Sequence, residues 1–182
     1  AEMNTDGTGW SATKRTSTSS YGKNDPQFQV VGSKIYYVWR ESDGIFQQIW
    51  TAVMNTDGTG WSATQRTDEW ADAAEPQLQV VSSKIYYVWR DGDDGNIWTA
   101  VMNTDGTGWS AIEREAVVNL TRGVPQLQVV GSKIYYVWHD ESDQIKTAVM
   151  NTDGTGWSYT QRTSGLSVRD PQLQVVGSKI YY

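Results

Sequence analysis

Five side chains in matching positions of the sequence have the chemistry of a sugar-binding pocket. Trp50 and Trp98 supply aromatic rings, and Arg40, Arg90 and His139 form an aligned column of polar, mostly cationic groups. Carbohydrate pockets pair an aromatic platform with guanidinium, amide or carboxylate hydrogen-bond partners. The sequence therefore predicts these five residues as a candidate ligand-binding set.

The column that holds Trp50 and Trp98 is expected to be partly exposed. Its third member is Lys146, and a core position rarely accepts lysine. The tryptophans of the preceding segment alternate with tyrosines and are interpreted as core: Trp39, Trp89 and Trp138.

Carboxylates that differ between the repeats lie in loop-like segments: Glu69, Asp72, Asp93, Asp94 and Glu141. We interpret them as solvated turn residues. His139 is the only histidine, and we expect an exposed polar substitute for the arginine of the other repeats. Cysteine is absent, so the sequence offers no thiolate site and predicts no metal ligands.

These residues recur because the chain is built from repeats of one unit. The strings NTDGTGWS, QVV and SKIYY each occur four times. Within a unit, the segments 34–40, 48–54, 60–66 and 76–82 alternate in side-chain character, and turn residues separate them. Four short strands per repeat predict an all-β β-propeller of four-stranded antiparallel blades, with a β-solenoid as the competing repeat fold.

The repeats divide one domain, residues 1–182, into full units at about 26–66, 76–114 and 125–162. Residues 171–182 match the first two strands of a unit, and residues 1–15 match the last two. We expect four blades, with one composite blade formed by the two termini. A longer array, or a larger ring completed by self-association, is the alternative.

The turn before each fourth strand resembles the Asp-box of sialidase-type (BNR) propellers. Each copy has Thr, Asp and Gly and, three residues after that Gly, a tryptophan, although Gly stands directly before the tryptophan where the family has Thr or Ser. The resemblance implies a structural role, in which the aspartate caps its turn and the tryptophan packs between strands. The residues concerned are Asp6, Trp10, Asp57, Trp61, Asp105, Trp109, Asp153 and Trp157. A calcium loop is the alternative, but each copy has one carboxylate and lacks the distal glutamate.

The same resemblance raises the possibility of a sialidase-like glycosidase. Glycosidase chemistry requires two unlike acidic or nucleophilic groups that converge on one sugar. Near-identical repeats place like groups in rings, such as Arg15, Arg66, Arg114 and Arg162. We therefore expect no enzyme activity and no cofactor.

Composition favours a binding protein without nucleic-acid or membrane partners. The formal net charge is −6, and no apolar run is long enough for a membrane span. Repeated equivalent pockets suit a repetitive ligand. The prediction is a non-catalytic propeller that binds carbohydrate multivalently, in the manner of a lectin, with self-association possible. A protein-binding or structural scaffold is the alternative, and an extracellular or cell-surface location is favoured.

Overall fold

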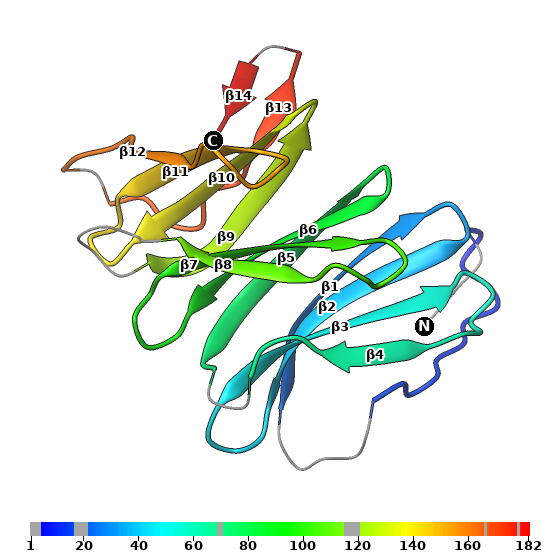
Figure 1. The fold of residues 1–182 in the computed structure, drawn as a ribbon. Helices are drawn as coiled ribbons and strands as arrows, with labels where there is room; N and C mark the ends of the chain where they lie inside the picture. The colour runs from blue at the N-terminus through cyan, green and yellow to red at the C-terminus, as the bar shows by residue number, and fades with distance from the viewer. Residues whose placement is uncertain (1–4, 17–21, 69–70, 115–120, 166, 178) are drawn as a thin grey trace.

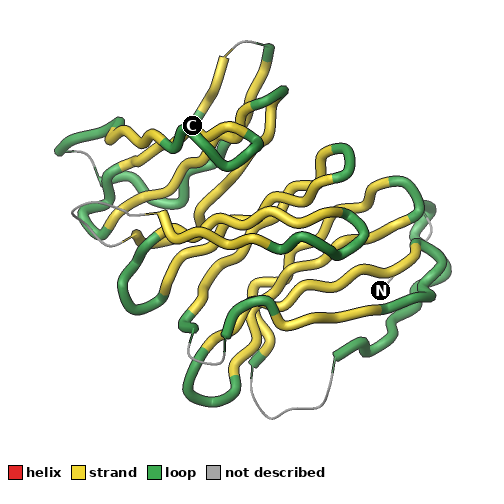
Figure 2. Tube along the Cα trace, viewed as in Figure 1, coloured by secondary structure: helices red, strands yellow, loops and turns green. Residues whose placement is uncertain are grey.

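The computed structural model describes residues 5–16, 22–68, 71–114, 121–165, 167–177 and 179–182. These residues form strands and turns, and the traced chain of Figure 2 alternates between the two throughout. The prediction of an all-β fold is confirmed. No helix in these ranges is long and apolar enough to cross a membrane.

Three sheets each contain four antiparallel strands in sequential order, and we call these sheets blades. Blade 1 contains β1 (Lys23–Val31), β2 (Lys34–Ser42), β3 (Gln47–Asn55) and β4 (Ser62–Gln65). Blade 2 contains β5 (Ala73–Val81), β6 (Lys84–Asp91), β7 (Ile97–Asn103) and β8 (Ser110–Arg114). Blade 3 contains β9 (Thr121–Val130), β10 (Lys133–Asp140), β11 (Ile145–Asn151) and β12 (Ser158–Gln161). The terminal hairpin contains β13 (Gln174–Val176) and β14 (Lys179–Tyr181).

The alternating residues give each blade two apolar faces. One core cluster joins Tyr36 and Val38 of blade 1 to Val80 and Tyr87 of blade 2. A second cluster repeats this contact between blades 2 and 3. Burial of apolar surface on both faces is what holds successive sheets together.

The blades follow one another in an open arc, with blade 1 and the terminal hairpin at opposite ends (Figure 1). β5 contacts β1 on one side and β9 on the other, so the first strand of each blade lies innermost. β13 and β14 pair only with each other among the described strands. The sheets do not close into a ring, so the composite blade expected from the two termini is not assembled in this arrangement.

Each innermost strand begins with an irregularity in its pairing. The register shifts between Asn24 and Gln27 in β1, and between Ala74 and Gln77 in β5. A corresponding shift in the β9–β10 pair falls opposite Trp138. Such bulges bend the strand and redirect side chains, and Asp25 and Glu75 stand within the bulges of β1 and β5.

Candidate functional site

The bulges bring acidic residues to the same end of successive blades. Asp25, Glu75 and Asp170 each stand directly before a proline, with φ angles of 54°, 55° and 50°. Left-handed backbone is costly for residues other than glycine and is concentrated at functional positions. The repeated strain indicates that the fold holds these carboxylates in defined places.

Arginines of the second strands meet two of these carboxylates. Arg90 Nε donates to Glu75 Oε2 at 2.8 Å. Arg40 Nε lies 2.7 Å from Asp25 Oδ2, an ion pair whose angles are outside those of a hydrogen bond. Both pairs are about one quarter exposed, so they remain accessible from solvent while they are fixed in position.

Asp72 lies in the segment that passes from blade 1 to blade 2. It forms a parallel bridge with Gln47 of β3, and its carbonyl oxygen accepts a hydrogen bond from the Gly92 N–H group. Partial burial raises the pKa of its carboxyl group, and the negative charges of Asp93 and Asp91 add to the effect. The carboxyl group of Asp72 therefore retains its proton to a higher pH than that of an ordinary aspartate.

We name this set of groups the acidic rim: Asp25, Asp72, Glu75, Asp91 and Asp93, with Arg40 and Arg90. A cavity of about 290 Å³ opens beside it, between blades 2 and 3. Arg90 and Asp93 form one wall of the cavity, and Thr121, Arg122 and Gly123 form the other. Its volume is close to the lower bound of the roughly 300–1,000 Å³ of small-ligand sites.

His139 corrects one prediction, because its side chain is buried rather than exposed. Its Nδ1 atom accepts a hydrogen bond of 3.3 Å from the Asp170 N–H group. A Cβ atom on Gly123 would lie 2.1 Å from His139 Cε1, and the Gly123 φ angle is +71°. The glycine therefore leaves room for the imidazole at the place where the other blades have an arginine–carboxylate pair.

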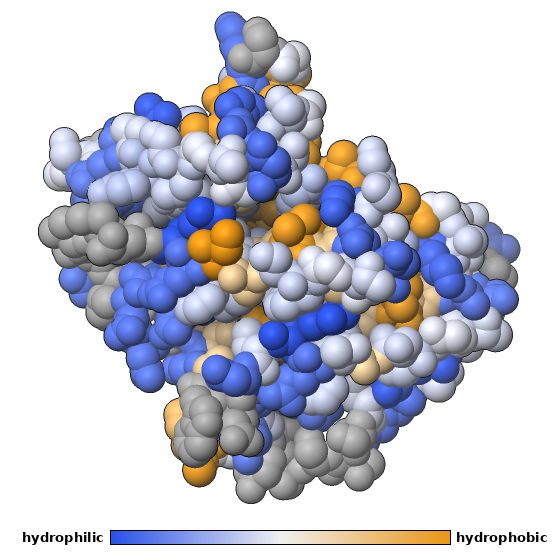
Figure 3. Space-filling model, viewed as in Figure 1, coloured by the Kyte–Doolittle hydropathy of each residue, from blue (hydrophilic) through white to orange (hydrophobic). Residues whose placement is uncertain are grey.

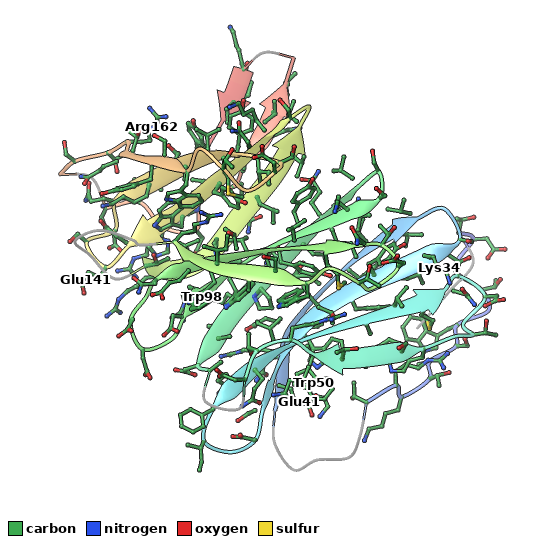
Figure 4. The ribbon with its side chains drawn as sticks, viewed as in Figure 1. Lys34, Glu41, Trp50, Trp98, Glu141 and Arg162 are labelled. Carbon is green, nitrogen blue, oxygen red and sulfur yellow. The ribbon has the colours of Figure 1, made fainter. Side chains whose placement is uncertain are left out.

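Trp50 and Trp98 are half-buried and stack on the tryptophans of the preceding strands. The ring centroids are 6.2 Å apart for Trp39 and Trp50, and 6.0 Å apart for Trp89 and Trp98. Figure 4 shows Glu41, Trp50, Trp98 and Glu141 toward one side of the arc, with Lys34 at the far end of blade 1. Neither Trp50 nor Trp98 lines the 290 Å³ cavity, whereas Arg90 does.

The aligned Lys146 is almost fully buried, at 6% exposure, so the premise that lysine marks an exposed position is wrong here. Its Nζ lies 3.3 Å from Asp140 Oδ2, and Asp140 is fully buried. The charge is accommodated because the partner carboxylate is enclosed with it.

The repeated turn aspartates bind their own turns. Asp57 Oδ1 accepts hydrogen bonds from Thr59 N at 2.9 Å and from Thr59 Oγ1 at 2.7 Å. These bonds lower the pKa of the carboxyl group. The same contacts recur at Asp6, Asp105 and Asp153.

The tryptophans of the turn motif differ between the blades and the N-terminal segment. Trp61, Trp109 and Trp157 pack on the aromatic residues of β2, β6 and β10. Trp10 is exposed, because it belongs to residues 5–16, which stand outside the described blades.

Within the described ranges, no group of three or more His, Cys, Asp or Glu residues could hold a metal ion. Two residues singled out from the variable loops, Glu69 and Trp70, lie outside the described residues. The sequence did carry a signal for part of the acidic rim that was missed. An acidic residue directly precedes the proline at Asp25 and Glu75 of the rim, and also at Asp170, which lies outside it.

No protein-family model and no curated protein sequence matches this chain, so the Asp-box resemblance stays a prediction. Solved structures do match its fold. The catalytic domain of the GH62 α-L-arabinofuranosidase of Coprinopsis cinerea gives a TM-score of 0.55 at 11% identity. The GH62 α-L-arabinofuranosidase of Podospora anserina, in complex with cellotriose, gives 0.54 at 10% identity. Each match covers 80% of this chain and 52% of the other.

A GH43 β-1,3-galactosidase gives a TM-score of 0.54 at 12% identity, over 77% of this chain and 32% of that structure. The chain thus spans about half the length of the GH62 structures and a third of this one. At these identities the likeness establishes the fold, which is a propeller-like assembly of β-sheets.

The comparisons contradict two predictions, that of a non-catalytic lectin-like protein and that of an absence of enzyme activity. The matched structures are glycoside hydrolases, including a catalytic domain. The symmetry argument behind both predictions also fails locally. The corresponding positions carry unlike groups: Asp25 pairs with Arg40 in blade 1, Glu75 pairs with Arg90 in blade 2, and blade 3 has His139 beside Gly123. The repeats are therefore not chemically equivalent at their bulges.

Proposed function

We propose that this chain is a propeller domain of a carbohydrate-active enzyme that hydrolyses glycosidic bonds at the acidic rim. One observation carries the proposal: Asp72 and Glu75 lie close in sequence at one blade end but in unlike environments. Partial burial raises the pKa of Asp72, while Glu75 is ion-paired to Arg90. Two carboxyl groups with separate environments are the requirement of glycoside hydrolysis.

In the proposed reaction, Asp72 is the general acid. A carboxyl group with a raised pKa keeps its proton to higher pH than an ordinary aspartate and can transfer it to the oxygen of the leaving group. Glu75 is the carboxylate that activates water or attacks the sugar. Asp93 and Arg90, on the cavity wall, accept and donate hydrogen bonds to the sugar hydroxyl groups.

The charges of the site favour a neutral sugar. The acidic rim and its cavity hold five carboxyl groups against the guanidinium groups of Arg40, Arg90 and Arg122. An excess of negative charge repels an acidic sugar. Neutral pentosides and hexosides are therefore proposed in preference to sialic acid, and the match to arabinofuranosidases and a galactosidase supports this choice.

The test is an assay of the purified chain on aryl α-L-arabinofuranosides, β-galactosides and β-xylosides, followed by neutral oligosaccharides. We expect slow turnover of at least one of them and a loss of roughly 100-fold or more in Asp72→Asn and Glu75→Gln. Asp94→Asn is the matched control, because Asp94 is exposed in the Asp93 loop and does not line the cavity.

Two results would overturn the proposal. The first is a folded protein without turnover on the whole panel. The second is turnover that Asp72→Asn and Glu75→Gln leave as intact as Asp94→Asn does.

A further inference from the structure

One polar contact recurs at every junction between successive sheets. The side chain of Gln29 reaches from β1 to β5, where its Oε1 atom accepts a hydrogen bond of 2.6 Å from the Val80 N–H group. Gln79 accepts the equivalent bond from Val129 at 2.5 Å, and Gln128 accepts it from Val175 at 2.8 Å. Each glutamine thus satisfies a backbone N–H group that the sheet itself leaves unpaired.

An apolar contact accompanies each bond. Tyr36 of blade 1 and Val80 of blade 2 share one core cluster, in which they are 7% and 5% exposed. Tyr86 of blade 2 and Val129 of blade 3 are the same pair in the next cluster. The junction is therefore a built interface with two fixed sides: a glutamine face, which carries Gln and Tyr and accepts the hydrogen bond, and a valine face, which carries Val and donates it.

Both ends of the arc present this interface without its partner. Val30 of blade 1 corresponds to Val80 and is 52% exposed, and Tyr181 of the terminal hairpin corresponds to Tyr36 and is 53% exposed. Beside them, Phe28 and Val176 are 66% and 55% exposed. Among the described residues, neither the Val30 N–H group nor the Gln174 side chain has the recurrent bond.

The free valine face of blade 1 also has a cavity at its outer side. A cavity of about 400 Å³ lies there, lined by Ile35, Tyr37 and Trp61 of blade 1 and by Ser11, Thr13 and Arg15 of the N-terminal segment. Arg15 donates to the Gly58 carbonyl at 2.8 Å, as Arg114 of blade 2 donates to Gly154 of blade 3. The N-terminal segment therefore occupies the place of a preceding blade's outer strand, and among the described residues no inner strand of such a blade packs beside it.

We propose that a second copy of this chain supplies those strands. Its terminal hairpin, β13–β14, docks on blade 1, with Tyr181 against Val30 and the Gln174 side chain accepting from the Val30 N–H group. The two free faces lie at opposite ends of the arc (Figure 1), so a head-to-tail contact between copies satisfies both. Patches of apolar surface stand out on a largely polar face in Figure 3, consistent with sheets whose apolar faces reach the surface.

The test is the mass of the chain in solution, measured by sedimentation equilibrium over a wide concentration range. The single chain has a mass of 20.4 kDa, and we expect an assembly of two or more copies. Val30→Glu disrupts the valine face, Tyr181→Lys disrupts the glutamine face, and each is expected to reduce the assembly to a single chain. Ile45→Glu is the matched control, because Ile45 is an exposed apolar residue in a loop outside both faces.

Mixing the two variants distinguishes this contact from others. The Val30→Glu chain keeps its glutamine face and the Tyr181→Lys chain keeps its valine face, so the mixture should form a dimer with one intact junction. This mixture also controls for misfolding, because an unfolded variant restores nothing. The proposal fails if the unaltered chain stays at 20.4 kDa throughout, or if both variants remain associated. Closure within one chain, or association through another surface, is then the explanation.

Discussion

The guanidinium group of Arg114 in blade 2 lies over the indole ring of Trp157 in blade 3, with Cζ 5.4 Å from the ring centroid. Arg66 has the same relation to Trp109, at 5.4 Å. Arg114 also donates to Thr99 Oγ1 at 3.1 Å within its own blade and to the Gly154 carbonyl at 3.1 Å in the next. This column of arginines connects blades, and the structure explains its recurrence without a role in ligand binding.

Replacement of Arg114 by methionine should lower the free energy of unfolding by about 1–3 kcal/mol. The variant loses the cation–π contact and the hydrogen bonds across the junction. Arg114→Lys should recover only part of the loss, because an ammonium group lacks the planar fork of donors. Urea denaturation measures the difference. Arg122→Met, at an exposed arginine, is the control, and an equal effect in both variants would contradict the junction role.

The buried pair of Lys146 and Asp140 predicts an unequal response to truncation. Asp140 Oδ1 also accepts hydrogen bonds from Ser142 N at 3.0 Å and Gln144 N at 2.9 Å, which fix the following turn. Asp140→Ala should therefore destabilise the fold by about 3–5 kcal/mol, because it leaves a buried ammonium group and an uncapped turn. Lys146→Met should cost less, because the Asp140 carboxylate keeps its turn partners.

A double-mutant cycle over these two positions measures their coupling from denaturant midpoints. We expect the double variant to be more stable than Asp140→Ala alone. Additive losses would show that the two buried charges do not depend on each other.

The raised pKa of Asp72 predicts a pH dependence of stability. The folded chain binds a proton at Asp72 more readily than the unfolded chain does, so this group lowers stability as pH rises from about 4, the ordinary value. Asp72→Asn should therefore stabilise the protein at neutral pH and have little effect at pH values well below 4. Paired thermal melts of the two proteins across this range give the difference directly. A variant less stable at neutral pH would reverse the sign and contradict the assignment.

The effect of Asp72 must be measured as the difference in stability between the Asp72→Asn variant and the parent chain. Other carboxylates change the stability of both proteins with pH in the opposite direction. Hydrogen bonds in the turns lower the pKa values of Asp57, Asp105 and Asp153. Their contribution to stability is present at neutral pH and is lost on acidification. Subtraction of the two melting series cancels these groups and leaves Asp72.

Most of the secondary structure follows from local pattern. The segments expected at 34–40 and 48–54 lie within β2 (Lys34–Ser42) and β3 (Gln47–Asn55). Alternation sets which residues face the neighbouring sheets, and glycine and aspartate in the turns set where each strand ends. These signals lie within a few residues of one another, so no distant contact is needed to recognise them.

The candidate site was less predictable because it depends on departures from the repeat. The exposed position expected for His139 was wrong, since the space that receives its ring is provided by Gly123 on another strand. The exposure inferred from Lys146 failed for a similar reason, because Asp140 supplies its charge partner. The buried environments of His139 and Lys146 are each set by a residue at another position, which a comparison of the aligned positions alone does not reveal.

The sequence by itself determined that the chain is an array of antiparallel four-stranded units, because hydrophobic alternation and turn chemistry act over short distances and recur with the repeat. Only the tertiary structure decided that Asp72, Asp93 and the arginine-paired Glu75 gather at one end of the sheets. It also decided that the arc leaves Val30 and Tyr181 uncovered at its two ends. The physical reason is that the burial, the exposure and the pKa of a side chain depend on which sheets pack against one another. Because the repeats are nearly identical, the few residues that differ between them decide these properties at each site.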